Sequence, residues 1–289
     1  MNKILLFDKR KNADFSKWNS AADKLNISVT CVHFEDLLFH FSSNHTIITV
    51  QHIALSDFTL IFFRKKFGFE EEVVLLTRYA EQHDIRIADS VLSRRATYID
   101  RKSYECLLLS MHRIPFIESW GCRASSLQQQ QLPNLAFPLV VKATDVNRGE
   151  GVFLAKNNNE LMELTKKMSD KFILLQPFIE NDGDVRVLVI GNKVVAAIKR
   201  SRVSKTDFRN NVSQGATSTS IKLDEIVEQT AISAAKALAY DVAGVDLMYD
   251  KQTQRYLVME VNCGPQYDGL EQATGLSIAT ETLVYFKQL

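Results

Sequence analysis

The sequence predicts a mixed α/β and α+β fold, with an N-terminal α/β domain of residues 1–92 and a larger unit of residues 93–289. Three patterns predict it. Over the first ninety or so residues, short apolar runs alternate with amphipathic segments, which favours a small α/β sheet. Later, Gly191-Asn192 separates two β-branched runs, as in a two-residue hairpin. Residues 226–238 then carry an apolar stripe at helical spacing.

In the N-terminal domain, short β-branched or aromatic runs predict strands, and longer amphipathic segments predict helices. The expected strands are Ile4–Phe7, Ile27–Val32, Thr59–Phe63 and Ile85–Ala88, and the expected helices are Phe15–Leu25 and Glu70–His83. Asp14 is a candidate N-cap for the first helix. No G-x-G-x-x-G motif follows the first strand, so we expect no dinucleotide site there.

The larger unit carries sharper signals for both strands and helices. The expected strands are Leu139–Lys142, Val152–Ala155, Phe172–Leu175, Val185–Ile190 and Val194–Ile198, and the expected helices are Tyr98–Arg113, Glu160–Met168 and Ile226–Leu238. The first of these helices should end before Pro115, because proline interrupts helical hydrogen bonding. The polar stretch from Ser125 to Pro133 predicts a surface loop.

Composition excludes several classes of function. The net charge of +1 and the pI near 7.7 give no global field for nucleic acid or membrane, and Arg64-Lys65-Lys66 is expected to be a solvated cluster. The four cysteines form no C-x-x-C pair and complete no zinc set with histidine. The apolar run after Lys3 is too short for a signal peptide. We therefore expect a cytoplasmic protein.

A hairpin near the C-terminus predicts a metal site. Val245–Tyr249 and Tyr256–Val261 read as strands, and pairing about residue 253 places Asp246 opposite Glu260 with Asn262 on the same face. The other face is apolar. Two carboxylates and an amide are hard oxygen donors that suit Mg²⁺ or Mn²⁺. Spacing alone leaves open a solvated face with two unrelated acids.

The residues around this hairpin resemble a known signature. Glu260-Val261-Asn262-Cys263-Gly264-Pro265, then Gly269-Leu270-Glu271 and Thr274-Gly275, resemble the E-V-N-x-x-P, G-[IL]-E and T-G motifs of RimK-type ATP-grasp ligases. Further segments match in the same order from about residue 93 to the end. The resemblance implies an N-terminal α/β lobe, followed by two lobes that clamp ATP between them with two Mg²⁺ (or Mn²⁺) ions.

The resemblance also implies which residues bind the nucleotide. Lys142 would contact the phosphates, unless it is only a strand-end lysine that reaches solvent. Arg101, with Lys102 adjacent, would be an earlier phosphate contact. The segment Arg148-Gly149-Glu150-Gly151 would close over the phosphates, unless it is an ordinary turn. Gln176, Pro177, Phe178 and Ile179 would form the adenine hinge, and Asp184 would bond the ribose hydroxyls, unless it is an exposed turn acid.

Other matching residues would line the reaction centre. Arg186 and Arg200 would hold phosphoryl and carboxylate oxygens, for which a guanidinium fork is suited. Arg209, Asn210 and Asn211 match a segment that reaches the phosphates and metal. Asp246, Glu260 and Asn262 would ligate the ions. Cys263 would pack as a small residue.

The expected function is an ADP-forming carboxylate–amine ligase that acts through an acyl phosphate and joins an amino acid to a peptide, protein or coenzyme-like carboxylate. The alternatives are macrocyclisation of a peptide and a non-catalytic nucleotide-binding role. Phe62–Lys66 would be either a dock for an acidic leader peptide or an edge strand with solvated charges. Relatives are often oligomers, so a homo-oligomer is a further expectation.

Overall fold

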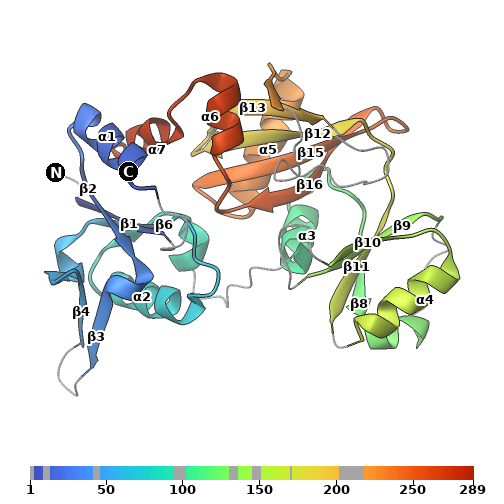
Figure 1. The fold of residues 1–289 in the computed structure, drawn as a ribbon, viewed down its shortest axis with the longest axis horizontal. Coiled ribbons are helices and arrows are strands. Elements are labelled where there is room, and N and C mark those ends of the chain that lie inside the picture. The colour runs from blue at the N-terminus through green and yellow to red at the C-terminus, as the bar shows by residue number, and fades with distance from the viewer. Residues whose placement is uncertain are drawn as a thin grey trace.

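The computed structural model describes residues 3–8, 14–41, 46–93, 102–129, 136–144, 151–169, 171–201 and 218–289. Its elements form three lobes, with the N-terminal lobe at one end, the lobe of β8–β11 at the other, and the sheet of β12–β16 between and above them (Figure 1). Between the strands lie short 3₁₀ helices: η2 (Phe34–Asp36), η3 (Leu55–Asp57), η4 (Ser90–Ser93) and η5 (Ala124–Gln129).

The N-terminal lobe is built on a parallel sheet with the order β2-β1-β6-β7. Its elements are β1 (Lys3–Asp8), α1 (Ser16–Leu25), β2 (Ser28–His33), β6 (Leu60–Phe63), α2 (Glu70–Gln82) and β7 (Arg86–Ile87). Leu5 and Phe7 belong to the same core as α2, whereas Ile4 and Leu6 belong to the core that contains Trp18 of α1. Because both faces are covered, β1 is apolar along nearly its whole length. The predicted strands and helices are confirmed.

Two details of this lobe differ from the sequence predictions. Asp14 is not the N-cap: Phe15 occupies that position, and the Asp14 carboxylate accepts instead from the N–H of Ser16 at 3.1 Å. A small antiparallel sheet of β3 (Leu37–Phe41), β4 (Thr46–Val50) and β5 (Ile53–Ala54) was not expected. It projects from the lobe in Figure 1.

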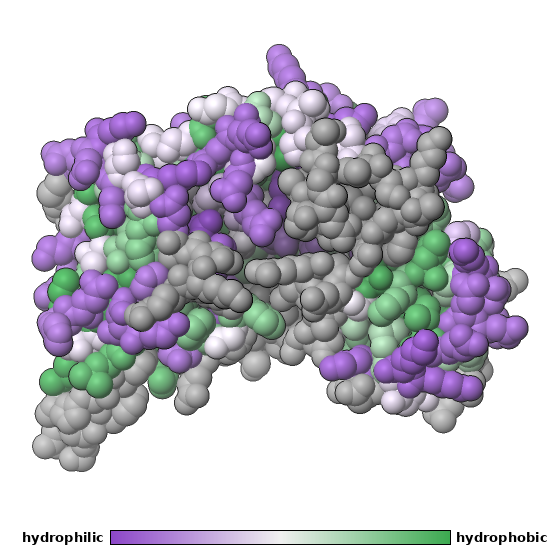
Figure 2. Space-filling model, in the orientation of Figure 1, coloured by the Kyte–Doolittle hydropathy of each residue, from purple (hydrophilic) through white to green (hydrophobic). Residues whose placement is uncertain are grey.

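The second lobe is an antiparallel sheet covered on one face by a helix. Its elements, in sheet order, are β10 (Val152–Ala155), β9 (Leu139–Ala143), β11 (Phe172–Pro177) and β8 (Trp120–Arg123), with α4 (Asn158–Lys167). Leu139, Val141 and Leu175 pack with Leu161 of α4, and the outer face of this helix is hydrophilic in Figure 2. The surface loop predicted from Ser125 is wrong up to residue 129, because η5 buries Leu127 in this core.

The third lobe is a five-stranded antiparallel sheet. Its strands, in sheet order, are β14 (Ser218–Ser220), β13 (Lys193–Ser201), β12 (Gly183–Ile190), β15 (Val242–Asp250) and β16 (Arg255–Asn262), and α5 (Glu225–Ala237) covers one face. The hairpin turn at Gly191-Asn192 is confirmed. Gly191 has a φ of 59°, and a Cβ there would meet the Tyr285 ring at 2.5 Å. Both the backbone conformation and the lack of space therefore favour glycine.

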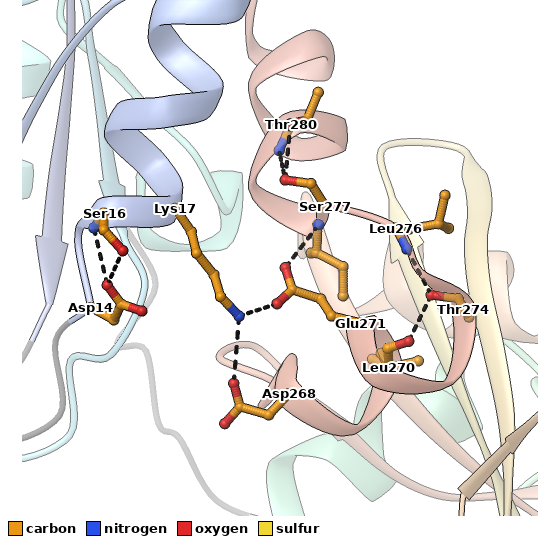
Figure 3. A network of polar contacts seen from close by, with 11 residues as sticks. Asp14, Ser16, Lys17, Asp268, Leu270, Glu271, Thr274, Leu276, Ser277 and Thr280 are labelled. Carbon is orange, nitrogen blue, oxygen red and sulfur yellow. Dashed lines mark hydrogen bonds and ion pairs between the residues drawn. The ribbon is translucent and has the colours of Figure 1, made fainter.

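The C-terminal segment returns to the N-terminal lobe. Helices α6 (Asp268–Thr274) and α7 (Ile278–Phe286) end the chain, and Figure 1 places α7 beside α1. The Phe286 ring lies edge-on to Phe62 of β6 at 5.1 Å between centroids. In the network of Figure 3, the ammonium of Lys17 on α1 bonds the Glu271 carboxylate, whose other oxygen accepts from the N–H of Ile278 at 3.1 Å. The first and last elements therefore share one core.

A pair of aspartates also joins the first and third lobes. Asp89 follows β7 and Asp241 precedes β15. The N–H of Asp241 donates to Asp89 Oδ1 at 2.9 Å, and the N–H of Asp89 donates to Asp241 Oδ2 at 2.5 Å. Asp89 is fully buried and its Oδ2 has no hydrogen-bond partner among the residues described. Burial raises the pKa of this carboxyl to about 7, despite the lowering effect of Lys66.

Candidate active site

Six polar side chains from the predicted site lie on one face of the five-stranded sheet. The pairing sets Asp184 opposite Arg200, Arg186 opposite Asp246, and Asp246 opposite Glu260. Directly paired residues of antiparallel strands share a face, as do residues two apart on one strand. Asn262 therefore joins them. The opposite face packs on α5 through residues such as Val187 and Val245.

The register predicted for the metal hairpin is confirmed at its centre and shifts nearby. Asp246 pairs with Glu260, but Leu247 pairs with Val258, so the strand carries a bulge at Met259. The expected pairing of the outer hairpin about residue 253 is therefore off by one residue beyond this point. The bulge leaves the two acids and Asn262 in the predicted arrangement.

Asp246 is the centre of a buried ion network. Arg186 donates to it through two nitrogens, Nε to Oδ1 and Nη2 to Oδ2, each at 2.7 Å. The guanidinium of Arg200 lies 3.2 Å from the same carboxylate. Burial alone would raise the pKa of Asp246, but these two cations outweigh it and hold the pKa below its usual value.

Asp184 is not the exposed turn acid of the alternative interpretation. It is 3% exposed, and its Oδ1 accepts from Arg200 Nε at 2.5 Å. Burial raises the pKa of Asp184 to about 6, against the lowering effect of Arg200. Arg200 thus links two carboxylates, Asp184 and Asp246, on neighbouring strands. The ribose-binding role of Asp184 stays a prediction.

Helix α3 (Lys102–Met111) brings basic and acidic groups to the edge of this sheet. Lys102 Nζ lies 3.2 Å from Glu260 Oε1. The lysine next to the predicted Arg101 therefore reaches Asp246 and Glu260, which we call the acidic pair. Glu105, which the sequence did not single out, accepts from the N–H of Val261 at 2.6 Å. Burial, and then the charge of Glu260, raise the pKa of Glu105 well above its ordinary value.

A pocket lies between the sheet of the second lobe, α3 and β16. Its lining residues are Lys102, Glu105, Cys106, Leu109, Phe116, Lys142, Leu174, Gln176, Val258 and Met259. Lys142 pairs with Leu174 across β9 and β11, and Gln176 lies two residues further on the same face, so the pleat directs all three away from α4. Burial lowers the pKa of Lys142, while Glu260 raises it. Lys142 is thus a half-buried residue of the pocket lining, and its contact with the phosphates stays a prediction.

The predicted adenine hinge borders this pocket. Gln176 Nε2 donates to Ser119 Oγ at 2.8 Å, which leaves the amide oxygen as an acceptor. The N–H of Phe178 is used by the carbonyl of Pro138 at 3.1 Å. The N–H of Ile179 has no partner among the residues described. Pro177 ends β11. These groups match the donor and acceptor that an adenine edge requires, and their roles stay predictions.

Close packing favours glycine at two positions near Asn262, one in the signature that follows it and one on β15. A Cβ on Gly264 would lie 2.5 Å from the carbonyl oxygen of Arg64, and one on Gly244 would lie 2.7 Å from the ring of Pro265. Glycine therefore allows two close approaches around the strand β16. Cys263 accepts from Lys66 Nζ at 2.7 Å, so this small residue contacts the N-terminal lobe.

The edge-strand interpretation of Phe62–Lys66 is wrong, and the dock for a leader peptide stays a prediction. The strand β6 lies inside the sheet between β1 and β7, and Phe62 and Phe63 are fully buried. Arg64 pairs with Asp8 and lies over the Tyr267 ring, while Lys66 is only 8% exposed. Arg64 and Lys66 therefore contact the signature segment, through the Tyr267 ring and the Cys263 sulfur respectively.

Several predicted residues lie outside the described part of the chain. They are Arg101, Arg148, Gly149, Arg209, Asn210 and Asn211. Gly151 is described: it has a φ of 73°, and its carbonyl accepts from the N–H of Ala143 at 2.9 Å. Gly151 thus stands at the point where the predicted phosphate loop joins β10.

The donor set suits a divalent cation. Asn262 Nδ2 donates to the Gly244 carbonyl at 3.4 Å, which leaves its amide oxygen for a ligand. Asp246 and Glu260 supply carboxylate oxygens beside it, the donor type that Mg²⁺ and Mn²⁺ prefer. Across the described residues, no three His, Cys, Asp or Glu side chains form a metal cluster. An ion here would therefore need oxygens from a bound ligand as well.

A parallel N-terminal sheet, two antiparallel lobes, a lysine-lined pocket and an acidic sheet face together define the ATP-grasp class of fold. The model of the RimK-like ATP-grasp domain matches residues 102–286. The chain therefore belongs to the RimK-like ATP-grasp family. No helix in the described part of the chain is long and apolar enough to cross a membrane.

Curated relatives match part of the chain. The "Probable alpha-L-glutamate ligase" of Legionella pneumophila (strain Corby) is 37% identical over 155 residues, which are 52% of this chain and 50% of that protein. The protein of the same name from Haemophilus ducreyi (strain 35000HP / ATCC 700724) is 40% identical over 176 residues, or 60% and 57% of the two chains. The match thus spans about half the length of these relatives.

Solved structures share the fold over the whole chain. The ATP-grasp ligase PsnB, complexed with a phosphomimetic variant of its minimal precursor, Mg and ADP, has a TM-score of 0.75 at 14% identity and covers 99% of this chain and 98% of its own. The macrocyclase MdnC from Microcystis aeruginosa MRC, bound with precursor peptide MdnA, has a TM-score of 0.68 at 12% identity and covers 100% of both chains. At such identities the likeness establishes the fold.

Proposed function

We propose that this protein is an ATP-dependent carboxylate–amine ligase that forms an acyl phosphate and ADP. One observation carries the proposal: Arg186, Arg200, Asp246, Glu260 and Asn262 share one face of a sheet, beside a pocket lined by Lys142. Cations and oxygen donors in this arrangement suit the transfer of a phosphoryl group, since such catalysis consists mostly of positioning and charge neutralisation.

The nucleotide would lie between the second and third lobes. Gln176 and the N–H of Ile179 meet the adenine edge, and Lys142 and Lys102 meet the phosphates. Asp246, Glu260 and Asn262 hold Mg²⁺ or Mn²⁺, which neutralises phosphate charge and orients the γ-phosphoryl group when bound. Lys102 already neutralises part of the charge of Glu260 at 3.2 Å.

The reaction has two steps. A carboxylate oxygen attacks the γ-phosphorus, an O–P bond forms, and the bond to the β-phosphate oxygen breaks to release ADP. Arg186 and Arg200 hold the developing charge, because two guanidinium groups within 3.2 Å of Asp246 are fixed in place before substrate arrives. An amine then attacks the acyl carbon, loses a proton, and expels phosphate.

The names of the relatives support a substrate class. Those that match this chain at 37% and 40% identity are each named "Probable alpha-L-glutamate ligase". This supports an amino acid as the amine donor and a peptide, protein or coenzyme-like carboxylate as the acceptor. A homo-oligomer stays a prediction.

The products decide this proposal. Purified protein with ATP, Mg²⁺, a peptide pool and free amino acids should release ADP and phosphate, and the peptide should gain the mass of an amino acid residue. AMP with pyrophosphate would reject the acyl-phosphate route. Loss of water from the peptide without added amino acid would assign a macrocyclase, and tight ATP binding without turnover on any acid would assign a nucleotide-binding protein.

A variant tests the site itself. Glu260→Gln removes one oxygen charge from the acidic pair and should abolish ADP formation while leaving the unfolding transition near that of the wild type. Glu163→Gln on the exposed face of α4 is the matched control and should keep full activity. Wild-type turnover by Glu260→Gln at low Mg²⁺ would contradict the assignment.

A further inference from the structure

Helix α3 holds the outer edge of the sheet that carries the acidic pair. The strand β16 is the last strand on its side of the sheet, so every second backbone N–H points away from β15. At Val261 that outward N–H donates to the carboxylate of Glu105 at 2.6 Å. A side chain 156 positions earlier in the chain therefore binds this outer edge at Val261, as the backbone of Pro115 and Ile117 does at Val258.

The position of Val261 in β16 makes this hydrogen bond relevant to the proposed cation site. Val261 stands between Glu260 and Asn262, the two oxygen ligands that β16 supplies. Lys102 lies one turn before Glu105 on the same face of α3, and it pairs with Glu260 at 3.2 Å. Helix α3 thus contacts β16 twice, at the backbone of Val261 and at the side chain of Glu260.

Glu105 also belongs to the pocket beside the acidic face. It lines that pocket together with Lys142, Gln176 and Met259. Met259 is the bulged residue of β16, where the sheet ladder is interrupted. A strand weakened by a bulge has fewer internal bonds to fix its direction, so an external acceptor placed two residues later has more influence on where its side chains point.

We propose that Glu105 is a positioning residue of the active site. By accepting the N–H of Val261, it fixes the backbone between Glu260 and Asn262 and sets the angle at which their oxygens meet the cation. Glu105 does not itself touch the cation or the reacting atoms. The inference rests on the proposed function, because that function is what gives these two ligands their cation.

The test uses Mn²⁺ titrated into the full-length protein in the presence of saturating ADP, followed by electron paramagnetic resonance. Glu105→Met keeps the volume of the side chain but has no acceptor, and it should weaken Mn²⁺ binding roughly tenfold, the effect of losing about one strong hydrogen bond. Glu105→Gln retains an acceptor oxygen and should bind Mn²⁺ as the wild type does. The ADP concentration that saturates each protein is set from its own ADP affinity, measured without metal.

A matched control and two refuting outcomes complete the test. Glu118→Met replaces an exposed glutamate near the same pocket and should change nothing. Unchanged Mn²⁺ affinity in Glu105→Met would overturn the inference, and so would an equal loss in Glu105→Gln, since charge and not the Val261 contact would then be responsible. Neither result would contradict the proposed ligase activity. That activity fails only if wild-type protein forms no ADP with any acid, in which case the Mn²⁺ titration remains interpretable.

Discussion

The buried aspartate pair between the first and third lobes predicts a dependence of stability on pH. In an unfolded chain the pKa of aspartate is about 3.9, whereas the pKa of Asp89 in the folded protein is about 7. Between these values the folded protein keeps a proton that the unfolded chain has released. The free energy of unfolding should therefore fall as pH rises from about 4 to about 7.

The size of the effect follows from the shift. One pKa unit corresponds to about 1.4 kcal/mol, so a shift of roughly three units costs up to about 4 kcal/mol once Asp89 is ionised. Asp89→Asn removes this titration. The amide oxygen still accepts from Asp241, the amide nitrogen replaces the unpartnered Oδ2, and asparagine tolerates the φ of 64° at this position.

The assay is urea unfolding of wild type and Asp89→Asn at intervals from pH 5.5 to 8.5. The variant should gain stability relative to wild type as pH rises, with most of the gain complete just above pH 7. Asp84→Asn is the matched control, because Asp84 also has a positive φ, 55°, but is exposed. A stability difference between variant and wild type that does not change with pH would refute the reasoning.

Three further predictions concern single side chains. Lys142→Ala should raise the Kd for ATP roughly tenfold to a hundredfold, since a charge-assisted contact is worth about 1.5–3 kcal/mol; calorimetry would measure it, and unchanged affinity with an unchanged rate would contradict the assignment. Gly264→Ala places a Cβ 2.5 Å from the Arg64 carbonyl and should cost about 1–3 kcal/mol; an unaltered Tm would show that the loop yields freely. Phe286→Ala empties a fully buried site against Phe62 and should cost about 3–5 kcal/mol in urea unfolding; a loss below about 1 kcal/mol would mean that α7 contributes little to the core.

Local patterns predicted much of this molecule. The alternation of β15 and β16 placed Asp246 opposite Glu260 correctly, because two strands joined by a short polar stretch leave few possible registers. The bulge at Met259 was not predicted, since no residue there demands one. Likewise, the aromatic run of β6 predicted a strand, but the charges that follow it favoured a position at the edge of the sheet, and the structure places β6 inside it.

What the sequence could not reveal are contacts between distant polar residues. Glu105 with Val261, Asp89 with Asp241, and Lys66 with Cys263 are separated by 156, 152 and 197 positions. Periodicity predicts which side of an element is apolar, but it carries no information on which buried acceptor will meet which donor. Such pairs depend on how the lobes pack against one another. The surfaces that pack are formed by residues far apart in the sequence.

The packing of α7 on the N-terminal lobe bears on how the protein folds during synthesis. Ile4, Trp18 and Phe62 belong to the same core as Ile278, Leu283 and Phe286. The ribosome makes the first set long before the last, and domains usually fold in the order of their synthesis. One side of the N-terminal sheet should therefore keep apolar surface uncovered until residues 278–286 emerge from the ribosome. Chaperone contact during translation should concentrate on that interval, and a stalled chain lacking residues 278–286 should be an early substrate for proteolysis.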